Sequence, residues 1–486
     1  MLSYDMLYIA GRWVFPHGDG VIAVENPAAE AVIGSVPQGS AVDVDRAALA
    51  ARDAFLDWAR TPWPRRQELL RSIAAALRES GEKTARTITS ELGMPFDACL
   101  AVQALEPASI LEAYADEMDG IAWEHDIGWS RIVMEPVGVV GAITPWNYPL
   151  YQIACKVGGA LAAGCTVVLK PSELTPLNAY ALIEAAEKAG LPPGVLNLIT
   201  GHGSEAGEAL VRHPGIDAIS FTGSTVTGRR VAELASVTLK RVSMELGGKS
   251  ASIVLEGADL DRAVAGTIRS CFRNSGQSCS SHTRFLIPRR LEGRIMSIIS
   301  GRAGEVQLGD PAAHGNHLGP LVSGIQRERV TRYIREALAS GATLVVGGAD
   351  PPTGFERGYY VQPTVIVSLD PNAQIAQEEV FGPVLCVIPY DDVADAVRIA
   401  NGTPYGLSAG VWSATPEEGF EVARLLRAGE VQLNGAPFNI RSPFGGFGLS
   451  GYGRELGRYG IEEFLAPKAI HQSFADLSHA DSPVIA

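Results

Sequence analysis

The chain has 486 residues, of which 46% are hydrophobic, so it is long enough for about three domains and can bury a large core. Its 53 glycines and 30 prolines are scattered rather than periodic, which excludes a collagen-like or low-complexity protein. The formal net charge is −14 without long basic runs, which argues against a nucleic-acid partner.

Residues 1–10 lack the basic region and the apolar region of a signal peptide. Residues 137–155 carry no charge and have the length of a membrane span, but Pro145 and Pro149 interrupt them. We therefore expect a buried strand followed by a loop, and no membrane partner. The six cysteines form no Cys-x-x-Cys pair and no zinc-type spacing, so we expect no metal, no disulfide framework and a cytoplasmic location.

The first 125 residues begin with strand-like fragments and continue as helices. Apolar residues recur every three or four positions in 41–58 and 65–91, with Pro62 and Pro64 between these stretches. From residue 137, short apolar runs alternate with helical patterns. We expect strands at 137–143, 166–169, 196–199 and 216–221, and helices at 179–190 and 204–213.

Residues 257–434 repeat this alternation. Here we expect helices at 259–275, 325–340 and 393–400, and strands at 343–346, 364–367 and 384–388. Residues 443–460 are glycine-rich without a period and are expected to form a loop or connector. The whole pattern predicts an α/β fold with two doubly wound lobes, each built on a parallel sheet.

Cys279 has a polar setting that suits a reactive thiol. It follows Asn-Ser-Gly-Gln-Ser and precedes two serines, whereas Cys155 and Cys386 have apolar neighbours. A cysteine on an accessible turn is a candidate nucleophile, although surface-loop cysteines are also common without any such role.

Glu245 and Asn147 are the other candidates for chemistry. Glu245 lies between Met and Leu before Gly-Gly, where it is either a general base or a solvated loop charge. Asn147 lies between Pro145 and Pro149, where its amide either donates a hydrogen bond to an oxyanion or caps the next helix.

Three further segments fit a nucleotide site only weakly. Residues 221–228 join a strand to a helix with small residues, which leaves backbone N–H groups free for a pyrophosphate. Lys170 and Glu173 follow a strand, where they could bind ribose hydroxyls. Residues 201–207 nearly match a Gly-x-Gly-x-x-Gly pattern and are interpreted as an ordinary turn.

Seven motifs occur together in one order, and in this the chain resembles the aldehyde dehydrogenase superfamily over nearly its whole length. The motifs are Pro-Trp-Asn147, Lys170-Pro-Ser-Glu, Phe221-Thr-Gly-Ser, Glu245-Leu-Gly-Gly-Lys, Gly276-Gln-Ser-Cys, Glu379-Val-Phe-Gly-Pro and Pro443-Phe-Gly-Gly.

The resemblance implies a three-part subunit. A nucleotide-binding domain would comprise residues 1–125 and 147–250, and a catalytic domain would comprise 251–440. A small β arm, 126–146 with 460–486, would pair with a neighbouring subunit in a homodimer or homotetramer.

The resemblance also implies roles for individual residues. Cys279 would attack an aldehyde, Asn147 would stabilise the oxyanion, and Glu245 would activate water to hydrolyse the thioester. The implied cofactor contacts are Trp146, Lys170, Ser172, Glu173, Thr222, Gly223, Ser224, Leu246, Glu379 and Phe381. Because the Glu173 carboxylate would repel a 2′-phosphate, we expect NAD as the cofactor, while dominance of Lys170 would admit NADP.

Some family positions stay open. Lys156 and Glu455 belong either to a proton path or to a structural salt bridge. Cys155 stands where relatives often carry a large aromatic residue. The smaller cysteine side chain would widen the substrate tunnel. Phe438 and Ile440, in the loop 435–441, favour an apolar aldehyde, while Arg441 either faces solvent or attracts a carboxylate-bearing aldehyde.

We weigh the hydrolytic reaction against three alternatives. These are transfer of the thioester to coenzyme A, a catalytically silent nucleotide-binding scaffold, and a thiol esterase without redox chemistry. The presence of Glu245 argues against coenzyme A transfer, since that branch generally lacks the base. The combination of Cys279, Glu245 and Asn147 argues against a silent scaffold. An esterase without redox chemistry would have no use for the nucleotide-binding motifs.

Overall fold

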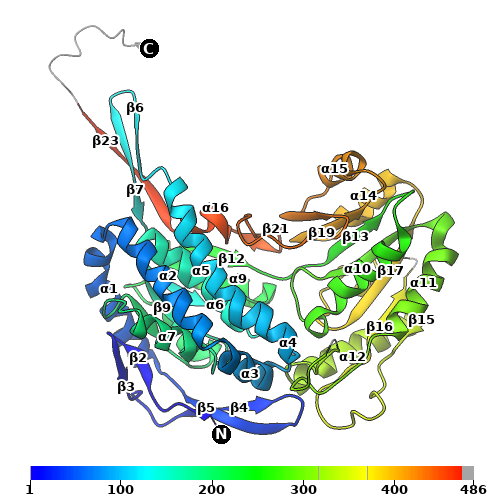
Figure 1. Cartoon of the computed structure of the whole chain (residues 1–486), viewed down its shortest axis with the longest axis horizontal. Coiled ribbons are helices and arrows are strands. Elements are labelled where there is room, and N and C mark those ends of the chain that lie inside the picture. Colours follow the sequence, from blue (N-terminus) through cyan, green and yellow to red (C-terminus); the bar gives the residue numbers. More distant parts are fainter. Residues whose placement is uncertain (1, 316, 369, 473–486) are drawn as a thin grey trace.

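The computed structural model describes residues 2–315, 317–368 and 370–472. Two α/β lobes lie side by side, and a narrow three-stranded arm projects from the first lobe (Figure 1). The first lobe is built on an eight-stranded sheet and the second on a seven-stranded sheet. The predicted fold class, two sheet-based lobes with a small β arm, is confirmed.

The first sheet has a parallel centre with antiparallel edges. Its order is β22-β12-β11-β8-β9-β10-β2-β3, and pairing from β12 to β10 is parallel. Strands β8, β9 and β11 are buried along their whole length, as expected for parallel strands covered on both faces. The strands are β2 (Leu7–Ile9), β3 (Arg12–Val14), β8 (Val139–Ile143), β9 (Thr166–Lys170), β10 (Leu196–Leu198), β11 (Ala218–Thr222), β12 (Arg241–Glu245) and β22 (Gly451–Tyr452).

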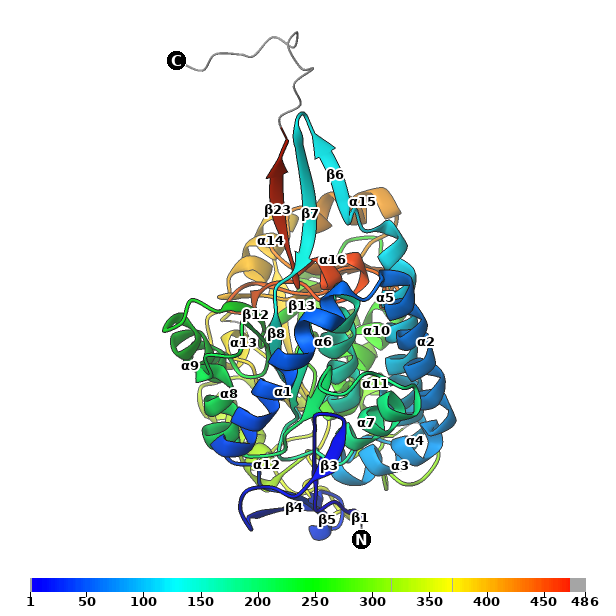
Figure 2. The same ribbon diagram turned by 90° about the vertical axis from the view of Figure 1, so that its left-hand side faces the viewer.

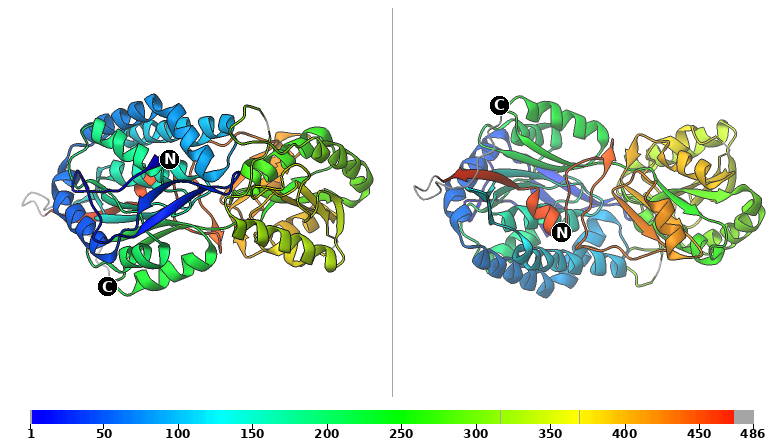
Figure 3. Two further views of the ribbon diagram at one scale, coloured as in Figure 1. Left: turned by 90° about the horizontal axis from the view of Figure 1, so that it is seen from below. Right: turned by 90° about the horizontal axis from the view of Figure 1, so that it is seen from above.

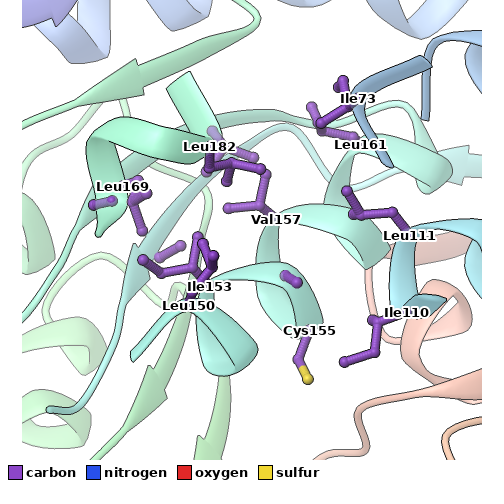
Figure 4. Close-up of a cluster of buried hydrophobic side chains, with 14 of the residues drawn as sticks. Ile73, Ile110, Leu111, Leu150, Ile153, Cys155, Val157, Leu161, Leu169 and Leu182 are labelled. Atoms are coloured by element: carbon purple, nitrogen blue, oxygen red, sulfur yellow. The ribbon is translucent and has the colours of Figure 1, made fainter. Parts of the chain in front are cut away.

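Helices cover both faces of this sheet and bury separate hydrophobic clusters. Figure 4 shows part of the larger cluster around Leu150, Ile153 and Val157 of α6. The first face carries α2 (Trp63–Glu79), α3 (Gly81–Leu92), α4 (Phe96–Cys99), α5 (Glu106–Glu117), α6 (Pro149–Ala163) and α7 (Ala179–Lys188). The other face carries α1 (Ala41–Arg60), α8 (Glu208–Arg212) and α9 (Thr225–Ser236).

The second sheet follows the same plan. Its order is β15-β16-β17-β14-β13-β19-β20, and only the edge strand β15 is antiparallel among these strands. The strands are β13 (Ser250–Val254), β14 (His282–Pro288), β15 (Thr343–Val346), β16 (Thr364–Val367), β17 (Val384–Tyr390), β19 (Ser408–Trp412) and β20 (Glu430–Leu433). One face packs against α12 (Gly324–Ala339), α13 (Gln374–Gln377), α14 (Val393–Asn401) and α15 (Pro416–Ala423), and the other against α10 (Leu260–Phe272) and α11 (Glu292–Gly304).

Two predicted helices end earlier than their periodicity indicated. The stretch 65–91 is divided between α2 and α3 at Ser80, where the backbone leaves the helical region. The stretch 259–275 stops at Phe272, because Asn274 and Ser275 adopt left-handed backbone angles with φ of 51° and 55°. Within the described residues, no helix combines the length and apolar character needed to cross a bilayer.

The arm is an antiparallel sheet of β6 (Glu124–Ile127), β7 (Ser130–Pro136) and β23 (Leu465–His471), which Figure 2 shows extending beyond both lobes. The predicted range 126–146 is too long, because it includes β8, which pairs with β9 and β11 inside the first sheet. Residues 473–486 of the predicted arm lie outside the described residues.

Segments outside the two main sheets also join the lobes. The hairpin β4 (Val21–Asn26) and β5 (Ala31–Pro37), with β1 (Leu2–Ser3), runs beneath the first lobe toward the second (Figure 3, left). There the Glu30 carboxylate accepts a hydrogen bond from the Gly358 N–H at 2.8 Å. The predicted connector 443–460 contains two short strands, β21 (Phe447–Gly448), which pairs with β18 (Tyr405–Gly406), and β22, before α16 (Gly457–Glu462).

Candidate active site

The pairing register of the first sheet brings the predicted motifs to one edge. Ile143 of β8 pairs with Lys170 of β9, and Thr222 of β11 pairs with Glu245 of β12. The carboxyl ends of these strands are therefore level, and the segments that follow them lie together. In open parallel sheets this edge is where ligands bind.

Cys279 lies on a loop from the second lobe that faces this edge. The loop follows α10 and is fixed by buried polar contacts: the Ser275 hydroxyl donates to Gly319 O at 2.7 Å, and Gln277 Oε1 accepts from the Val322 N–H at 2.9 Å. Cys279 is half-buried rather than on an exposed turn, and it lines two cavities. Burial raises the pKa of its thiol, and the carboxylates of Glu379 and Glu245 raise it further.

Asn147 lies beside this loop. Its Nδ2 donates a hydrogen bond to Gln277 O at 3.0 Å, and its own carbonyl accepts from Asn274 Nδ2 at 2.9 Å. The alternative role as a helix cap is wrong. The N-cap of α6 is Tyr148 rather than Asn147, and no side chain caps this helix. An amide nitrogen has two N–H groups, so the second stays available to a ligand in the adjoining cavity.

Glu245 is buried at the end of β12, with 2% of its surface exposed, so it is not a solvated loop charge. Neither carboxylate oxygen has a hydrogen-bond partner among the described residues. Burial raises the pKa of Glu245 well above its usual value, and nearby Glu455 raises it further while Lys156 opposes the shift. Three residues later, a Cβ on Gly248 would lie 2.3 Å from the Cys279 carbonyl, so only glycine allows this close approach of the two segments.

The first cavity, of about 190 Å³, lies between the lobes. Its lining includes nine of the predicted site residues: Trp146, Asn147, Thr222, Gly223, Ser224, Leu246, Cys279, Glu379 and Phe381. Trp146 and Phe381 meet edge to face with ring centroids 5.3 Å apart. Glu379 accepts a hydrogen bond from the Gly248 N–H at 2.9 Å, and burial raises its pKa to about 7.

Two residues of α12 that the sequence analysis missed also line this cavity. Arg329 donates to Glu379 O at 2.6 Å, and Gln326 Nε2 donates to Phe381 O at 2.8 Å. Phe381 has a left-handed backbone with φ of 63°, which is unfavourable for an aromatic residue, so these bonds help to hold it. Gln326 and Arg329 are three residues apart on one predicted helix and so share a face of it. This spacing was the sequence signal that could have found them.

Lys170, the last residue of β9, and Ser172 and Glu173, which follow this strand, do not line this cavity. Lys170 Nζ is buried and contacts Glu173 Oε2 at 3.1 Å. Glu173 Oε1 also accepts from the Gly203 N–H at 3.4 Å. The segment interpreted as an ordinary turn, 201–207, therefore contacts a predicted ribose-binding residue.

The second cavity, of about 270 Å³, extends from the other side of Cys279. Its wall includes four aromatic residues, Tyr148, Tyr151, Phe438 and Phe444, and Cys155 also lines it. Figure 4 shows the Cys155 sulfur directed away from the labelled apolar side chains of α6.

Lys156 and Glu455 form a buried ion pair beside this cavity. Lys156 Nζ lies 2.5 Å from Glu455 Oε1, and the two side chains are 0% and 4% exposed. The other oxygen of Glu455 has no hydrogen-bond partner in the described part of the chain. Of the two roles left open, the salt bridge is present, and the pair lies near Glu245.

Comparisons with known proteins agree with this geometry. The family model of the aldehyde dehydrogenase family matches residues 13–470. A 3-succinoylsemialdehyde-pyridine dehydrogenase from Pseudomonas sp is 45% identical, with 97% of this chain and 99% of that protein aligned. The crystal structure of an aldehyde dehydrogenase C mutant from Pseudomonas syringae, in complex with NAD+ and octanal, superposes with a TM-score of 0.95 at 44% identity, covering 96% of each chain. The NAD+ complex of a Mycobacterium tuberculosis aldehyde dehydrogenase gives a TM-score of 0.94 at 39% identity, covering 97% of this chain and 99% of that one. The chain belongs to the aldehyde dehydrogenase family.

Proposed function

We propose that this enzyme oxidises an aldehyde to the carboxylic acid with NAD, through covalent intermediates on Cys279. The observation that carries the proposal is the position of Cys279, which lies between two cavities and beside both Asn147 and the Glu245 segment. One cavity suits the nicotinamide end of a dinucleotide, and the other suits a small organic substrate.

The first cavity has features that fit the nicotinamide dinucleotide. Gly223 and Ser224 stand at the N-terminus of α9, where N–H groups of the first helical turn favour phosphate. Ser224 caps this helix through the Thr227 N–H at 3.2 Å. Glu379 offers a carboxylate to ribose hydroxyls, and Phe381 offers a flat apolar face to the nicotinamide. When bound, the nicotinamide would accept the hydrogen and electron pair that the substrate loses.

The protein's own part begins with the thiolate of Cys279, which attacks the aldehyde carbon to form a thiohemiacetal. The negative charge develops on the former carbonyl oxygen. The free N–H of Asn147 Nδ2 and the backbone N–H of Cys279 would stabilise this charge. Loss of hydride from the carbon leaves a thioester on Cys279.

Glu245 would then remove a proton from water, which attacks the thioester and releases the acid and the thiol. Its raised pKa makes it a stronger base than an ordinary carboxylate, and its unpartnered oxygens are free to accept a proton. The Lys156–Glu455 pair lies near enough to influence the pKa of Glu245, which supports a role in passing this proton onward.

The choice of NAD over NADP rests on Glu173. Lys170 is already paired with this carboxylate at 3.1 Å, so a 2′-phosphate would meet a neutralised lysine and a nearby negative charge. Free ribose hydroxyls can instead donate to the carboxylate.

The arm supports assembly into a homodimer or homotetramer. Its sheet has two edges, β6 and β23, and it exposes Ile127, Trp129 and Ile470. Free sheet edges with apolar side chains favour pairing with a second copy. The six free cysteines are consistent with a reducing, cytoplasmic setting.

The test is NADH formation from purified protein, NAD and a panel of apolar aldehydes. We expect Cys279→Ala to abolish turnover and Glu245→Gln to retain one burst of NADH while losing steady turnover. Steady turnover in Glu245→Gln would contradict the assigned base. A signal that depends on coenzyme A would instead support the acylating reaction.

A further inference from the structure

Gln152 of α6 lies at the boundary between the two cavities. Of the described residues that line them, only Gln152 and Cys279 belong to both. In the proposed function the nicotinamide occupies the first cavity and the aldehyde the second, so the reacting carbon lies at this boundary. Gln152 is therefore close to the chemistry at Cys279.

One end of the Gln152 amide is held by the protein. The Thr222 hydroxyl donates a hydrogen bond to Gln152 Oε1 at 3.3 Å, and the two residues are 7% and 6% exposed. The amide nitrogen carries two N–H groups, and within the described ranges neither of them has a protein acceptor. The bond to Thr222 orients the amide, and the nitrogen remains to donate to a ligand.

A second buried glutamine near the same helix gives a contrast. Gln103, in the π-helix Leu100–Leu105, accepts a hydrogen bond from the Tyr151 N–H at 3.4 Å, and its Nε2 has no partner in the described part of the chain. That nitrogen is enclosed by protein, and Gln103 lines neither cavity. Of these two glutamines, Gln152 is the one with space for a ligand.

The sheet register brings Gln152 level with Glu245. Thr222, which holds Gln152, pairs with Glu245 across β11 and β12. One helical turn further along α6, Lys156 Nζ lies 3.3 Å from the Ser220 hydroxyl of β11, so this face of the helix follows β11 with Gln152 at the carboxyl end of the strand. The Glu245 oxygens lack a protein donor, and Gln152 Nε2 lacks a protein acceptor. A water molecule both donates and accepts, so it can satisfy both groups.

We propose that Gln152 Nε2 holds the water that attacks the thioester, by donating a hydrogen bond to the water oxygen while the water donates to Glu245. This inference rests on the proposed function of Cys279 and Glu245. One lone pair of the water accepts from Gln152, and the other bonds to the thioester carbon as a proton passes to Glu245. Collapse of the adduct breaks the carbon–sulfur bond and releases the carboxylic acid and the Cys279 thiolate. Gln152 exchanges no proton and fixes the direction of attack.

The test follows NADH formation by stopped flow, with saturating NAD and hexanal. Gln152→Met keeps the length of the side chain and removes both N–H donors. We expect its first turnover to match that of the wild type and its steady rate to fall by about 3- to 10-fold, the effect of one ordinary hydrogen bond. Gln103→Met is the matched control, because it also removes a buried amide beside α6, and it should keep the wild-type ratio of the two rates.

Deuterium on the aldehyde carbon separates a role in water attack from a structural role. This substitution slows the loss of hydride, so it should slow the first turnover of Gln152→Met. It should have little effect on the steady rate of this variant, because hydrolysis then limits turnover. If Gln152 only supported Cys279 or the nicotinamide, its loss would slow the first turnover and leave an isotope effect in both phases.

Two outcomes would overturn the inference while leaving aldehyde oxidation intact. One is an equal fall of the first-turnover and steady rates in Gln152→Met, and the other is a steady rate equal to that of the wild type. Gln152→Leu also lacks the donors and should give the same pattern, and it takes the place of Gln152→Met if that variant does not fold. Absence of NADH formation in the wild type would overturn the proposed function itself.

Discussion

Replacing Asn147 by alanine separates stabilisation of the oxyanion from support of the Cys279 loop. The side chain donates to Gln277 O at 3.0 Å, but this carbonyl also accepts from Asn274 Nδ2 at 3.3 Å. Gln277 O therefore keeps a partner in Asn147→Ala. The loss in stability should be near that of one ordinary hydrogen bond, about 1 kcal/mol.

The catalytic loss should be much larger. Removing one oxyanion donor costs about 2.7–4 kcal/mol in the barrier, which corresponds to a fall of about 100- to 1,000-fold in kcat. Single-turnover formation of NADH measures this step directly. The midpoint of thermal unfolding should change little, since about 1 kcal/mol shifts the Tm of a 150–250-residue domain by only about 2–4 °C.

Alkylation of Cys279 by iodoacetamide is the internal control, because displacement of iodide creates no oxyanion. We expect the alkylation rate of Asn147→Ala to match that of the wild type. A fall in NADH formation of less than about 10-fold would refute the oxyanion role. A parallel fall in both rates would show that Asn147 positions the thiol instead.

Three further predictions follow. Because burial raises the pKa of both Cys279 and Glu245, their reactive anions form at higher pH, and steady turnover should rise with pH; a rate profile that stays flat or falls as the pH is raised would contradict it. Lys156→Met leaves the Glu455 carboxylate buried without its cation and should destabilise the protein by about 3–5 kcal/mol, measured by thermal unfolding; a stability equal to the wild type would show that the pair contributes nothing. Gly445→Ala places a Cβ 2.6 Å from Gly453 O and 2.7 Å from Glu245 Oε1 and should slow thioester hydrolysis more than the NADH burst, measured by stopped flow; equal slowing of both phases would contradict this expectation.

Two of these predictions have matched control variants in the chain. Gly190→Ala also adds a Cβ at a positive φ, of 74°, but this Cβ would meet nothing within 4 Å, so the variant reports backbone strain without the contacts to Gly453 O and Glu245. The double variant Lys156→Met with Glu455→Gln removes both charges and should regain much of the stability lost in the single variant.

The amino-acid sequence by itself determined the alternation of strands and helices, and with it the two parallel-sheet lobes. It also made Asn147, Glu245 and Cys279 candidates, and their catalytic roles came only from the resemblance carried by all seven motifs in order. The level carboxyl ends of β8, β9, β11 and β12 then follow from parallel pairing, which is why these motifs meet.

Only the tertiary structure decided the environment of these residues. Burial of Glu245 and half-burial of Cys279 depend on segments far away in the chain, as do the bonds from Gln326 and Arg329 to the Glu379 and Phe381 carbonyls. The sequence also could not show that the arm ends before β8. An apolar strand has the same pattern whether it belongs to the arm or to the main sheet of the first lobe. The pairing of Lys156 with Glu455 is likewise a matter of distances across the fold, since sequence spacing fixes the order of charges and packing fixes which of them meet.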